Sequence, residues 1–444
     1  MSALKPNDLD SLLMPFTPNR AFKKKPRFVT GAKGMHYYAD DGRKLLDATA
    51  GLWCVNAGHS HPKIVEAIRK QAAELDYAPN FQLAHPLAFH TSAQLCAAMP
   101  GDIDHVFLSN SGSEAVETAI KVALAYQRAR GKGTKIKIIG RERAYHGTNI
   151  GGTSVGGMSP NRHAFGANLM PHVDHLPHTY DSGKQAFAKN QPEWGAHLAD
   201  ALENIVQFHH ADNIAAVMVE PVAGSTGVLS PPRGYLQKLR EICDRHDILL
   251  IFDEVITAFG RLGKMTGAEY FGVMPDIIVA AKGINSGAVP MGATFMRGNI
   301  YETLTQGEGF ASDFLHGYTY SGHPLACAAA LAAQEAYRED GMFENAARLE
   351  KTWADALHSL KGAPHVVDIR TIGLMAGVEL DPGARKHPQE MSRTMEVFDR
   401  LYWEQDIVGR YTGNTLAFSP PLIINEEQID MIVTRLRRAL GAVA

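Results

Sequence analysis

The sequence predicts an α/β protein with two domains, a large one built on a mostly parallel sheet flanked by helices and a smaller α+β one. Two observations lead to this prediction. Short runs rich in isoleucine and valine alternate with helix-like stretches over about 200 residues, and the character of the chain changes near residue 323. Strands that alternate with helices are typical of an open parallel sheet.

Five apolar runs are expected to form the strands of the large domain. Each is bounded by turn residues and is apolar on both faces, which favours a strand covered by helices on either side. Residues 236–246 lie between two of these runs and have helical spacing. The runs are 105–108, 135–139, 214–219, 248–252 and 276–281.

The C-terminal part combines long amphipathic stretches with short strands. Helices are predicted over 324–338, 342–360 and 426–440, and strands over 366–369, 375–379 and 415–419. Near the N-terminus, residues 36–39 and 44–47 flank an Asp-Gly pair, which predicts a hairpin. We therefore expect a large domain over 51–322 and a small domain over 323–444. Residues 1–50 are assigned to the small domain, although the sequence alone does not decide this.

The bulk composition excludes several classes of function. The chain has 444 residues, of which 45% are hydrophobic and 20% charged, and its net charge is −3. Nothing in this balance favours a nucleic acid or an anionic membrane as partner, and no apolar stretch approaches the ~20 residues of a membrane helix. The cysteines are far apart and form no C-x-x-C pair, so a cytoplasmic location fits best.

Polar and aromatic side chains follow each predicted strand of the large domain. Ligands of open α/β sheets bind at the carboxyl ends of the strands, so these side chains are expected to meet at one edge. In chain order they are Ser111, Gly112 and Ser113 after the first strand, Tyr145 after the second, Glu220 after the third, Asp253 at the end of the fourth and Lys282 after the fifth.

This set matches what a pyridoxal ring requires. Its aldehyde needs a primary amine, and a partly desolvated Lys282 supplies one in its nucleophilic form. The ring nitrogen needs a carboxylate such as Asp253, which keeps the ring an electron sink. The phosphate needs a helix start, which the S-x-x-E pattern at Ser111 predicts. Each feature alone has an ordinary structural explanation, such as a helix cap or a surface lysine; their shared position favours a cofactor site.

The same motifs resemble those of a known family. From about Met14 to the C-terminus, the sequence is similar to class III aminotransferases of pyridoxal-phosphate (PLP) fold type I, most of all the ω-amino acid–pyruvate branch, or ω-transaminases. The resemblance is carried by Ser111-Gly112-Ser113-Glu114-Ala115, Tyr145-His146-Gly147, Val219-Glu220-Pro221, Asp253-Glu254-Val255, Lys282 and the run from His316 through Thr319 to Pro324.

The resemblance implies a role for each site residue. Lys282 would be both the Schiff-base lysine and the catalytic base. The other cofactor residues would be Asp253 at the ring nitrogen, Val255 behind the ring, Tyr145 stacked on it, Glu220 close by, Ser111, Gly112 and Ser113 at the phosphate, and Thr319 reaching that phosphate from a neighbouring subunit. The substrate residues would be Leu52, Trp53, Phe81 and Arg410, the last as a mobile clamp for a carboxylate.

The resemblance also implies an activity and an assembly. An ω-amino acid such as β-alanine, or a primary amine, would give its nitrogen to a 2-oxo acid, pyruvate, which becomes alanine in a ping-pong reaction. Alternatives are a taurine– or diamine–pyruvate aminotransferase, a decarboxylating transaminase, an aminomutase, or a non-catalytic binding protein that kept the fold. A homodimer, or a dimer of such dimers, is expected.

Two other patterns are rejected. His172, His175 and His178 are spaced unlike a zinc motif, and the flanking prolines argue against one helix, so a loop with surface histidines and no metal is predicted. Gly263-Lys264 is not a phosphate-binding loop, because Met265 stands where a Ser or Thr is needed. No G-x-G-x-x-G follows a predicted strand, so nothing favours a dinucleotide cofactor.

Overall fold

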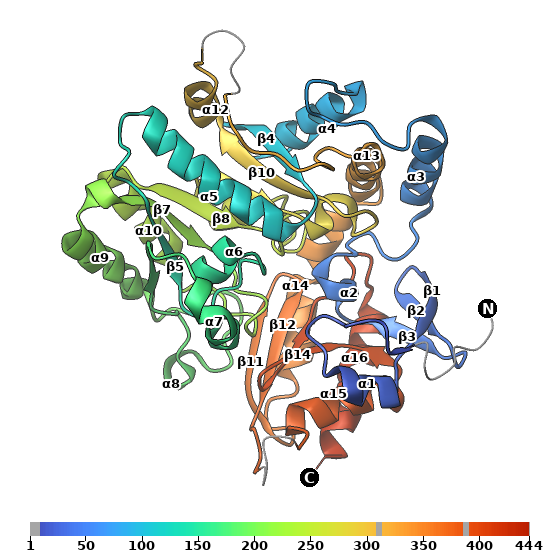
Figure 1. The fold of residues 1–444 in the computed structure, drawn as a ribbon. Helices are drawn as coiled ribbons and strands as arrows, with labels where there is room; N and C mark the ends of the chain where they lie inside the picture. Colours follow the sequence, from blue (N-terminus) through green and yellow to red (C-terminus); the bar gives the residue numbers. More distant parts are fainter. Residues whose placement is uncertain (1–8, 308–312, 385–389, 444) are drawn as a thin grey trace.

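A seven-stranded sheet forms the centre of the computed structural model, which describes residues 9–307, 313–384 and 390–443 (Figure 1). The strands are ordered β4-β10-β9-β8-β7-β5-β6. All of them run parallel except β10, which pairs antiparallel with β4 and β9. Their bounds are β4 Ile103–Ser109, β5 Lys137–Arg141, β6 Val173–Leu176, β7 Ile214–Val219, β8 Leu249–Asp253, β9 Ile277–Ala280 and β10 Gly292–Arg297.

Alternating side chains of the central strands supply two separate cores. Met218 and Ile251 join a core with α5 (Gly112–Ala129), whereas Val219 and Phe252 join the core that contains α10 (Tyr235–Arg245). Because both faces are covered, β7 and β8 are buried along their whole length. The predicted α/β class and all five predicted strands of this sheet are thus confirmed.

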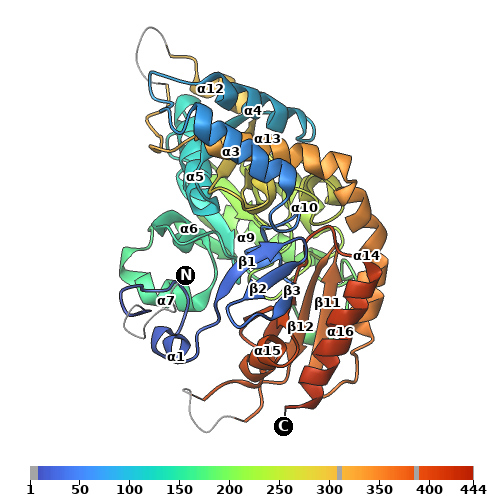
Figure 2. The same ribbon diagram turned by 90° about the vertical axis from the view of Figure 1, so that its right-hand side faces the viewer.

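Two smaller sheets complete the architecture. One is antiparallel in the order β11-β12-β15-β14, with bounds Val366–Ile372, Met375–Leu380, Thr415–Phe418 and Arg410–Thr412. It packs with α14 (Met342–His358) and α15 (Arg393–Trp403), and α16 (Glu426–Gly441) packs against both of these helices. Figure 2 shows α14 and α16 side by side. The predicted helices and strands of this region are confirmed.

The other small sheet joins the two ends of the chain. It has the order β1-β2-β3-β13, with bounds Val29–Lys33, His36–Ala39, Lys44–Asp47 and Ile407–Val408. The predicted hairpin is present as β2–β3, and β3 pairs in parallel with β13. The division into 1–50, 51–322 and 323–444 stays a prediction; the β3–β13 pairing supports placing residues 1–50 with the C-terminal part.

The remaining helices surround these sheets. Among them, α13 packs against α3, α4 and the short turn Lys282–Asn285. Their bounds are α1 Asn19–Lys24, α2 Ala50–Trp53, α3 Pro62–Glu74, α4 Pro86–Ala97, α6 Ile150–Val155, α7 Ser159–Phe165, α8 Ser182–Gln185, α9 Ala201–His209, α11 Gly267–Phe271, α12 Gly298–Leu304 and α13 Pro324–Glu339.

One local prediction was wrong. The histidine-rich stretch 172–178 was expected to be a loop, but Val173–Leu176 forms β6, an edge strand that pairs with β5. The ring of His175 in this strand is hydrogen-bonded within the protein, because its Nε2 lies 3.0 Å from the carbonyl oxygen of Gly156. No cluster of three side chains suited to hold a metal is found in the described part of the chain.

Candidate active site

A cavity of about 330 Å³ lies at the carboxyl ends of β4, β5, β7, β8 and β9. It collects side chains that are far apart in the sequence, as expected for an open α/β sheet. Its lining includes Ser111, Gly112, Ser113, Tyr145, Glu220, Asp253, Val255 and Lys282 from the predicted set, together with Asn110, His146, Gly147, Ser225, Ile256, Ala281, Asn285, Gly287, Val289, Pro290 and Met291.

Lys282 is held in an unusual backbone conformation. It begins a single 3-10 turn directly after β9 and has φ 45°, in the left-handed region. Non-glycine residues adopt this conformation at a cost and often at functional sites. Burial lowers the pKa of Lys282 to about 8, although the nearby carboxylate of Asp253 opposes this effect. Near neutral pH, a larger fraction of this amine is therefore neutral and nucleophilic than in an ordinary lysine.

Asp253 points its carboxylate into the cavity wall and is held on both oxygens. Oδ1 accepts a hydrogen bond from the backbone N–H of Val255 at 3.1 Å. Oδ2 lies 2.8 Å from Nδ1 of His146, whose side chain is fully buried. Sequence reasoning did not assign His146 a role, although it stands within the Tyr-His-Gly motif; only the fold shows which carboxylate it meets.

The first turn of α5 also lines the cavity. Oγ of Ser111 caps the helix by accepting from the N–H of Glu114, and Oε2 of Glu114 accepts from the N–H of Asn110. The predicted helix start is thus confirmed. A Cβ on Gly112 would lie 2.9 Å from Val255, so only glycine fits here without displacing its neighbour. A helix N-terminus lined with such groups suits an anion.

Glu220 and Tyr145 are connected through the backbone. Oε1 of Glu220 accepts from the N–H of Tyr145 at 2.9 Å. Burial raises the pKa of Glu220 to about 7, partly offset by the charge of His146 and reinforced by Asp253. Burial also raises the pKa of the Tyr145 phenol, against the opposing charge of Arg410. Tyr145, Glu220 and Asp253 therefore share one electrostatic environment.

Arg410 lies near this environment without lining the cavity. It is the first residue of β14, and its charge acts on both Tyr145 and Lys282. Burial lowers the pKa of its guanidinium. Among the described residues, its side chain has no hydrogen bond or ion pair. A half-buried guanidinium without an anionic partner is suited to bind an incoming carboxylate.

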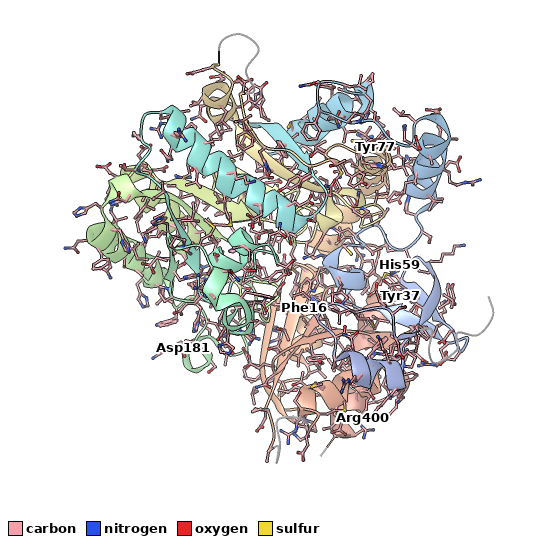
Figure 3. All side chains as sticks on the ribbon, viewed as in Figure 1. Phe16, Tyr37, His59, Tyr77, Asp181 and Arg400 are labelled. Atoms are coloured by element: carbon pink, nitrogen blue, oxygen red, sulfur yellow. The ribbon has the colours of Figure 1, made fainter. Side chains whose placement is uncertain are left out.

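Besides Arg410, four predicted residues do not line the cavity of the single chain. Leu52 is largely exposed and Trp53 is buried, but neither lines it. Phe81 lines a separate surface depression of about 750 Å³. Thr319 lies beside that depression, where its carbonyl oxygen accepts a hydrogen bond from the hydroxyl of Tyr77 at 3.0 Å. Tyr77 is labelled in Figure 3.

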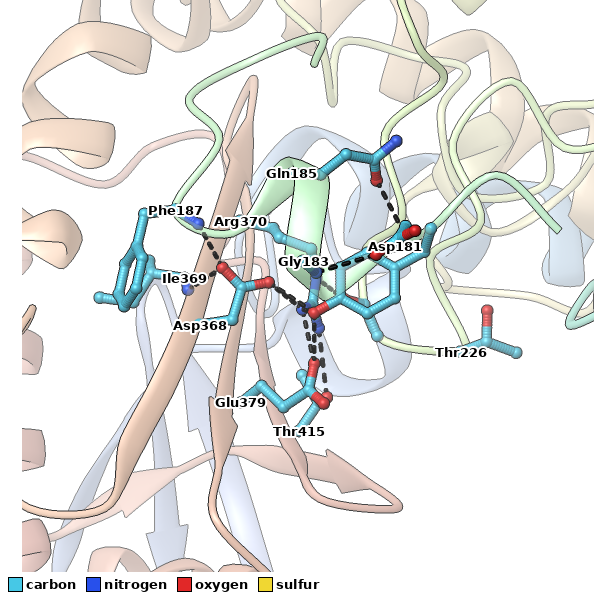
Figure 4. Close-up of polar contacts among 12 residues, drawn as sticks. Asp181, Gly183, Gln185, Phe187, Thr226, Asp368, Ile369, Arg370, Glu379 and Thr415 are labelled. Atoms are coloured by element: carbon cyan, nitrogen blue, oxygen red, sulfur yellow. Dashed lines mark hydrogen bonds and ion pairs between the residues drawn. The ribbon is translucent and has the colours of Figure 1, made fainter. Parts of the chain in front are cut away.

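A buried ion cluster, also missed by sequence reasoning, supports one cavity wall. Arg370 pairs with Asp368 on its own strand, β11, and with Glu379 on the neighbouring strand, β12 (Figure 4). Nε of Arg370 also donates to the carbonyl oxygen of Gly227 at 3.0 Å. Gly227 follows Ser225 in the turn after β7, and Ser225 lines the cavity. The cluster thus connects the antiparallel small sheet to the wall of the site.

The fold and this cavity define a transferase that uses pyridoxal phosphate, and comparison with known proteins places it within that class. The family model for aminotransferase class-III matches residues 18–440. The chain belongs to the class-III aminotransferase family, as its sequence motifs predicted. Its cofactor is therefore pyridoxal 5'-phosphate, its fold is fold type I, and its substrates are an amine donor and a keto acid.

Similar proteins match over nearly the whole chain. An ω-aminotransferase of Caulobacter vibrioides is 57% identical over 437 residues, covering 98% of each chain. A β-alanine–pyruvate aminotransferase of Pseudomonas aeruginosa is 46% identical over 434 residues, covering 97% of this chain and 95% of that protein. The crystal structure of an ω-transaminase from Pseudomonas jessenii in complex with PMP has a TM-score of 0.92 at 32% identity, covering 99% of this chain and 98% of that one.

No helix among the described residues has both the length and the apolar character needed to cross a membrane. All four cysteines are free thiols in the structure.

Proposed function

We propose that this aminotransferase moves the amino group of an ω-amino acid such as β-alanine, or of a primary amine, to pyruvate and releases alanine. One observation carries the proposal: a single cavity collects the amine of Lys282, the carboxylate of Asp253 and the N-terminus of α5. The names of the similar proteins, which include a β-alanine–pyruvate aminotransferase, support the choice of substrates.

The cavity residues fit the cofactor by the chemistry of their groups. Lys282 supplies the amine for a covalent bond to the aldehyde, and Asp253, backed by His146, supplies the carboxylate for the ring nitrogen. The tight approach of Gly112 to Val255 brings the helix N-terminus close to the ring site. We assign Ser111, Gly112 and Ser113 to the phosphate, with the partner subunit's Thr319 completing that site, and Tyr145 and Val255 to the two ring faces.

Proton transfer is the step that this chain's own residues perform. When bound, the cofactor supplies an electron sink for the carbon that carries the nitrogen. Lys282, with a pKa lowered to about 8, would accept the proton from that carbon on its Nζ and give it back in the 1,3-shift. Asp253, held in place by Nδ1 of His146, would supply the carboxylate for the positive charge of the ring nitrogen. Glu220 fixes the backbone of Tyr145 and so the aromatic wall.

Substrate selection is assigned to residues outside the cofactor cavity. We propose that Arg410 grips the carboxylate of an amino or keto acid and moves aside for an uncharged donor. Its lack of a partner within the described residues supports this role, since no ion pair must break first. Leu52, Trp53 and Phe81 are proposed to shape the pocket for the rest of the donor.

We further propose that the functional unit is a homodimer, or a dimer of such dimers. The depression that Phe81 lines carries exposed apolar side chains, among them Phe89 at 69% and Leu315 at 89% exposure. Apolar patches of this kind mark protein interfaces, and Thr319 beside this one supports its predicted role across the interface. The cytoplasmic location stays a prediction.

A donor panel tests the proposed reaction. PLP-loaded protein is incubated with pyruvate and β-alanine, taurine, a diamine or an aromatic primary amine, and both alanine and carbon dioxide are measured. Alanine without carbon dioxide supports amino transfer, and the best donor defines the branch. Carbon dioxide formed in step with alanine would instead indicate a decarboxylating enzyme, and no alanine from any donor would overturn the proposal.

A further inference from the structure

Asp47, the last residue of β3, holds the turn that follows it. Its Oδ1 accepts from the N–H of Thr49 at 2.9 Å, and its Oδ2 accepts from the N–H of Gly51 at 2.7 Å. Nε2 of His59 lies 2.8 Å from the same Oδ2. Because this oxygen already accepts from the N–H of Gly51, the contact fits the tautomer of His59 in which Nε2 is the donor. With no exposure to solvent, Asp47 has all of its partners inside the protein.

The turn that Asp47 holds is strained. We name residues 49–54 the Trp53 turn. Ala50 has φ 47° and Trp53 has φ 66°, so two non-glycine residues occupy the left-handed region within four positions. Such conformations persist only where the surroundings fix them. The carboxylate of Asp47, which accepts from the N–H groups of Thr49 and Gly51, is the group in position to fix them.

His59 is itself fixed in place. The ring of Tyr37 packs against it with 4.1 Å between the centroids (Figure 3). The hydroxyl of Tyr37 also approaches the turn, because a Cβ on Gly51 would lie 3.1 Å from it. Tyr37, Asp47 and His59 thus form one buried support beneath the Trp53 turn.

The Trp53 turn borders the segment that carries Lys282. A Cβ on Gly287, which lines the cavity, would lie 3.1 Å from Sγ of Cys54. Just beyond the turn, the N–H of Ala57 donates to Oγ of Ser286 at 2.9 Å. A shift of the turn would therefore move the wall of the cavity beside Lys282.

Asp47 also lies next to the strand that leads to Arg410. In the parallel β3–β13 pair, Val408 is the partner of Asp47, and the N–H of Ala48 donates to the carbonyl oxygen of Val408 at 3.0 Å. Arg410 follows two residues later. Asp47 is thus hydrogen-bonded to the Trp53 turn, and the next residue, Ala48, is hydrogen-bonded to the strand that leads to Arg410.

We propose that Asp47 and His59 are positioning residues that fix the Trp53 turn as one wall of the donor pocket and so restrict which amines fit. The inference deepens the proposed function and rests on it, because the pocket is defined by the amine donor. Asp47 and His59 do not line the cavity; they act through the turn.

Three variants and one matched control test this role in the PLP-loaded protein. Asp47→Asn replaces one of the accepting oxygens with an amide that donates, and His59→Leu removes the donor to Asp47. His59→Gln keeps an N–H donor. The control is Asp174→Asn, because Oδ2 of Asp174 also lies 2.8 Å from a histidine Nε2, that of His209, but outside the cavity lining.

The first measurement does not depend on catalysis. The rate of maleimide labelling at Cys54 is compared with that at Cys96 by peptide mass spectrometry; both thiols are partly accessible, and Cys96 is the reference for changes that are not local to the turn. Asp47→Asn and His59→Leu are expected to speed the labelling of Cys54 by about tenfold, the effect of losing about 1.4 kcal/mol of local stability, with Cys96 unchanged. His59→Gln and Asp174→Asn are expected to label like the parent protein.

The second measurement separates positioning from simple loss of stability. Asp47→Asn and His59→Leu are expected to raise KM for β-alanine about tenfold while kcat stays within about threefold, and to relax the preference between small and bulky amines. Unchanged Cys54 labelling together with unchanged KM, or labelling of Cys54 and Cys96 that rises in parallel as kcat falls, would overturn the inference.

The two measurements also distinguish a failure of this inference from a failure of the proposed function. If the parent protein forms no alanine from any donor, the proposed function fails, and Cys54 labelling still reports whether Asp47 holds the turn. If Asp47→Asn does not fold, the comparison of His59→Leu with His59→Gln decides the result.

Discussion

At the scale of single residues, burial sets the protonation of the groups that meet at the cavity. It lowers the pKa of Lys282 to about 8 and raises that of Glu220 to about 7, so both titrate close to neutral pH. Asp253 is paired with His146 in the same wall. An amine that is partly neutral beside a paired carboxylate is the arrangement that proton abstraction requires.

The lowered pKa of Lys282 gives a pH dependence for cofactor attachment. Only the neutral amine attacks an aldehyde, so the rate is expected to rise with pH through about 8 and then level off. An ordinary lysine would keep accelerating toward pH ~10.4. Stopped-flow absorbance after mixing apoprotein with PLP between pH 6 and 10 measures this rate; a profile that does not level off below about pH 9.5 would contradict the lowered pKa.

Arg410→Ala is expected to discriminate between substrates. Losing a charge-assisted contact to a carboxylate costs about 1.5–3 kcal/mol, so kcat/KM for β-alanine and pyruvate should fall by about 10- to 100-fold. Half-reactions of uncharged amines should change little. Single-turnover absorbance measures each half-reaction, with Arg437→Ala on the exposed side of α16 as control. Equal losses of kcat/KM for both substrate types would contradict the role of Arg410 as a carboxylate clamp.

Residues that follow strands could be predicted from the sequence, whereas their partners could not. Lys282 and Asp253 each stand directly after or at the end of an apolar run, a position that a parallel sheet turns toward its ligand. The contact of His146 with Asp253 joins residues 107 positions apart. The ion pairs of Arg370 and the bonds of Asp47 likewise depend on strand pairing, which local patterns do not encode.

At the scale of helices and strands, the strands that the hydrophobic pattern of the sequence did not predict depend on long-range pairing. β10 (Gly292–Arg297) is inserted antiparallel between β4 and β9, and nothing in its six residues distinguishes it from a loop after Lys282. β14 has only three residues and exists through its pairing with β15. Runs apolar on both faces, such as β7, were predictable because two helical layers cover them.

Gly112→Ala tests the close approach of α5 to the ring site. The added Cβ would lie 2.9 Å and 3.0 Å from the two methyl groups of Val255, so the helix start or Val255 must shift. PLP affinity is expected to fall by about tenfold, equal to about 1.4 kcal/mol. Equilibrium titration of the visible absorbance measures it.

The control for this change is Gly133→Ala, because a Cβ at Gly133 meets no atom within 4 Å. It should bind PLP like the parent protein. If Gly112→Ala also bound PLP unchanged, the N-terminus of α5 would not be the phosphate site.

At the scale of the whole molecule, the proposed site residues are divided between the cavity and the exposed apolar depression. The residues proposed to contact the ring all line the cavity of one chain, whereas Thr319 and Phe81 lie at the depression. A second copy seated there would cover apolar side chains and bring these residues to a site. The proposed dimer therefore links assembly to activity.

Leu315→Glu tests this link. Leu315 is 89% exposed in the single chain, and a charge there would be buried by the proposed interface. The variant is expected to elute as a monomer and to lose PLP and activity together, as measured by light scattering and absorbance. Phe208→Glu, at a position of α9 that is 79% exposed, should leave the mass unchanged. An active, PLP-saturated Leu315→Glu monomer would contradict the shared site.

The most direct test of the central claim is to locate the covalent bond between protein and cofactor. PLP-loaded protein is reduced with borohydride, digested, and mapped by mass spectrometry for the pyridoxyl group. We expect the label on the peptide that contains Lys282, and its absence, together with all alanine formation, in Lys282→Ala. A label on a different lysine, or a Lys282→Ala variant that still turns over, would contradict the account.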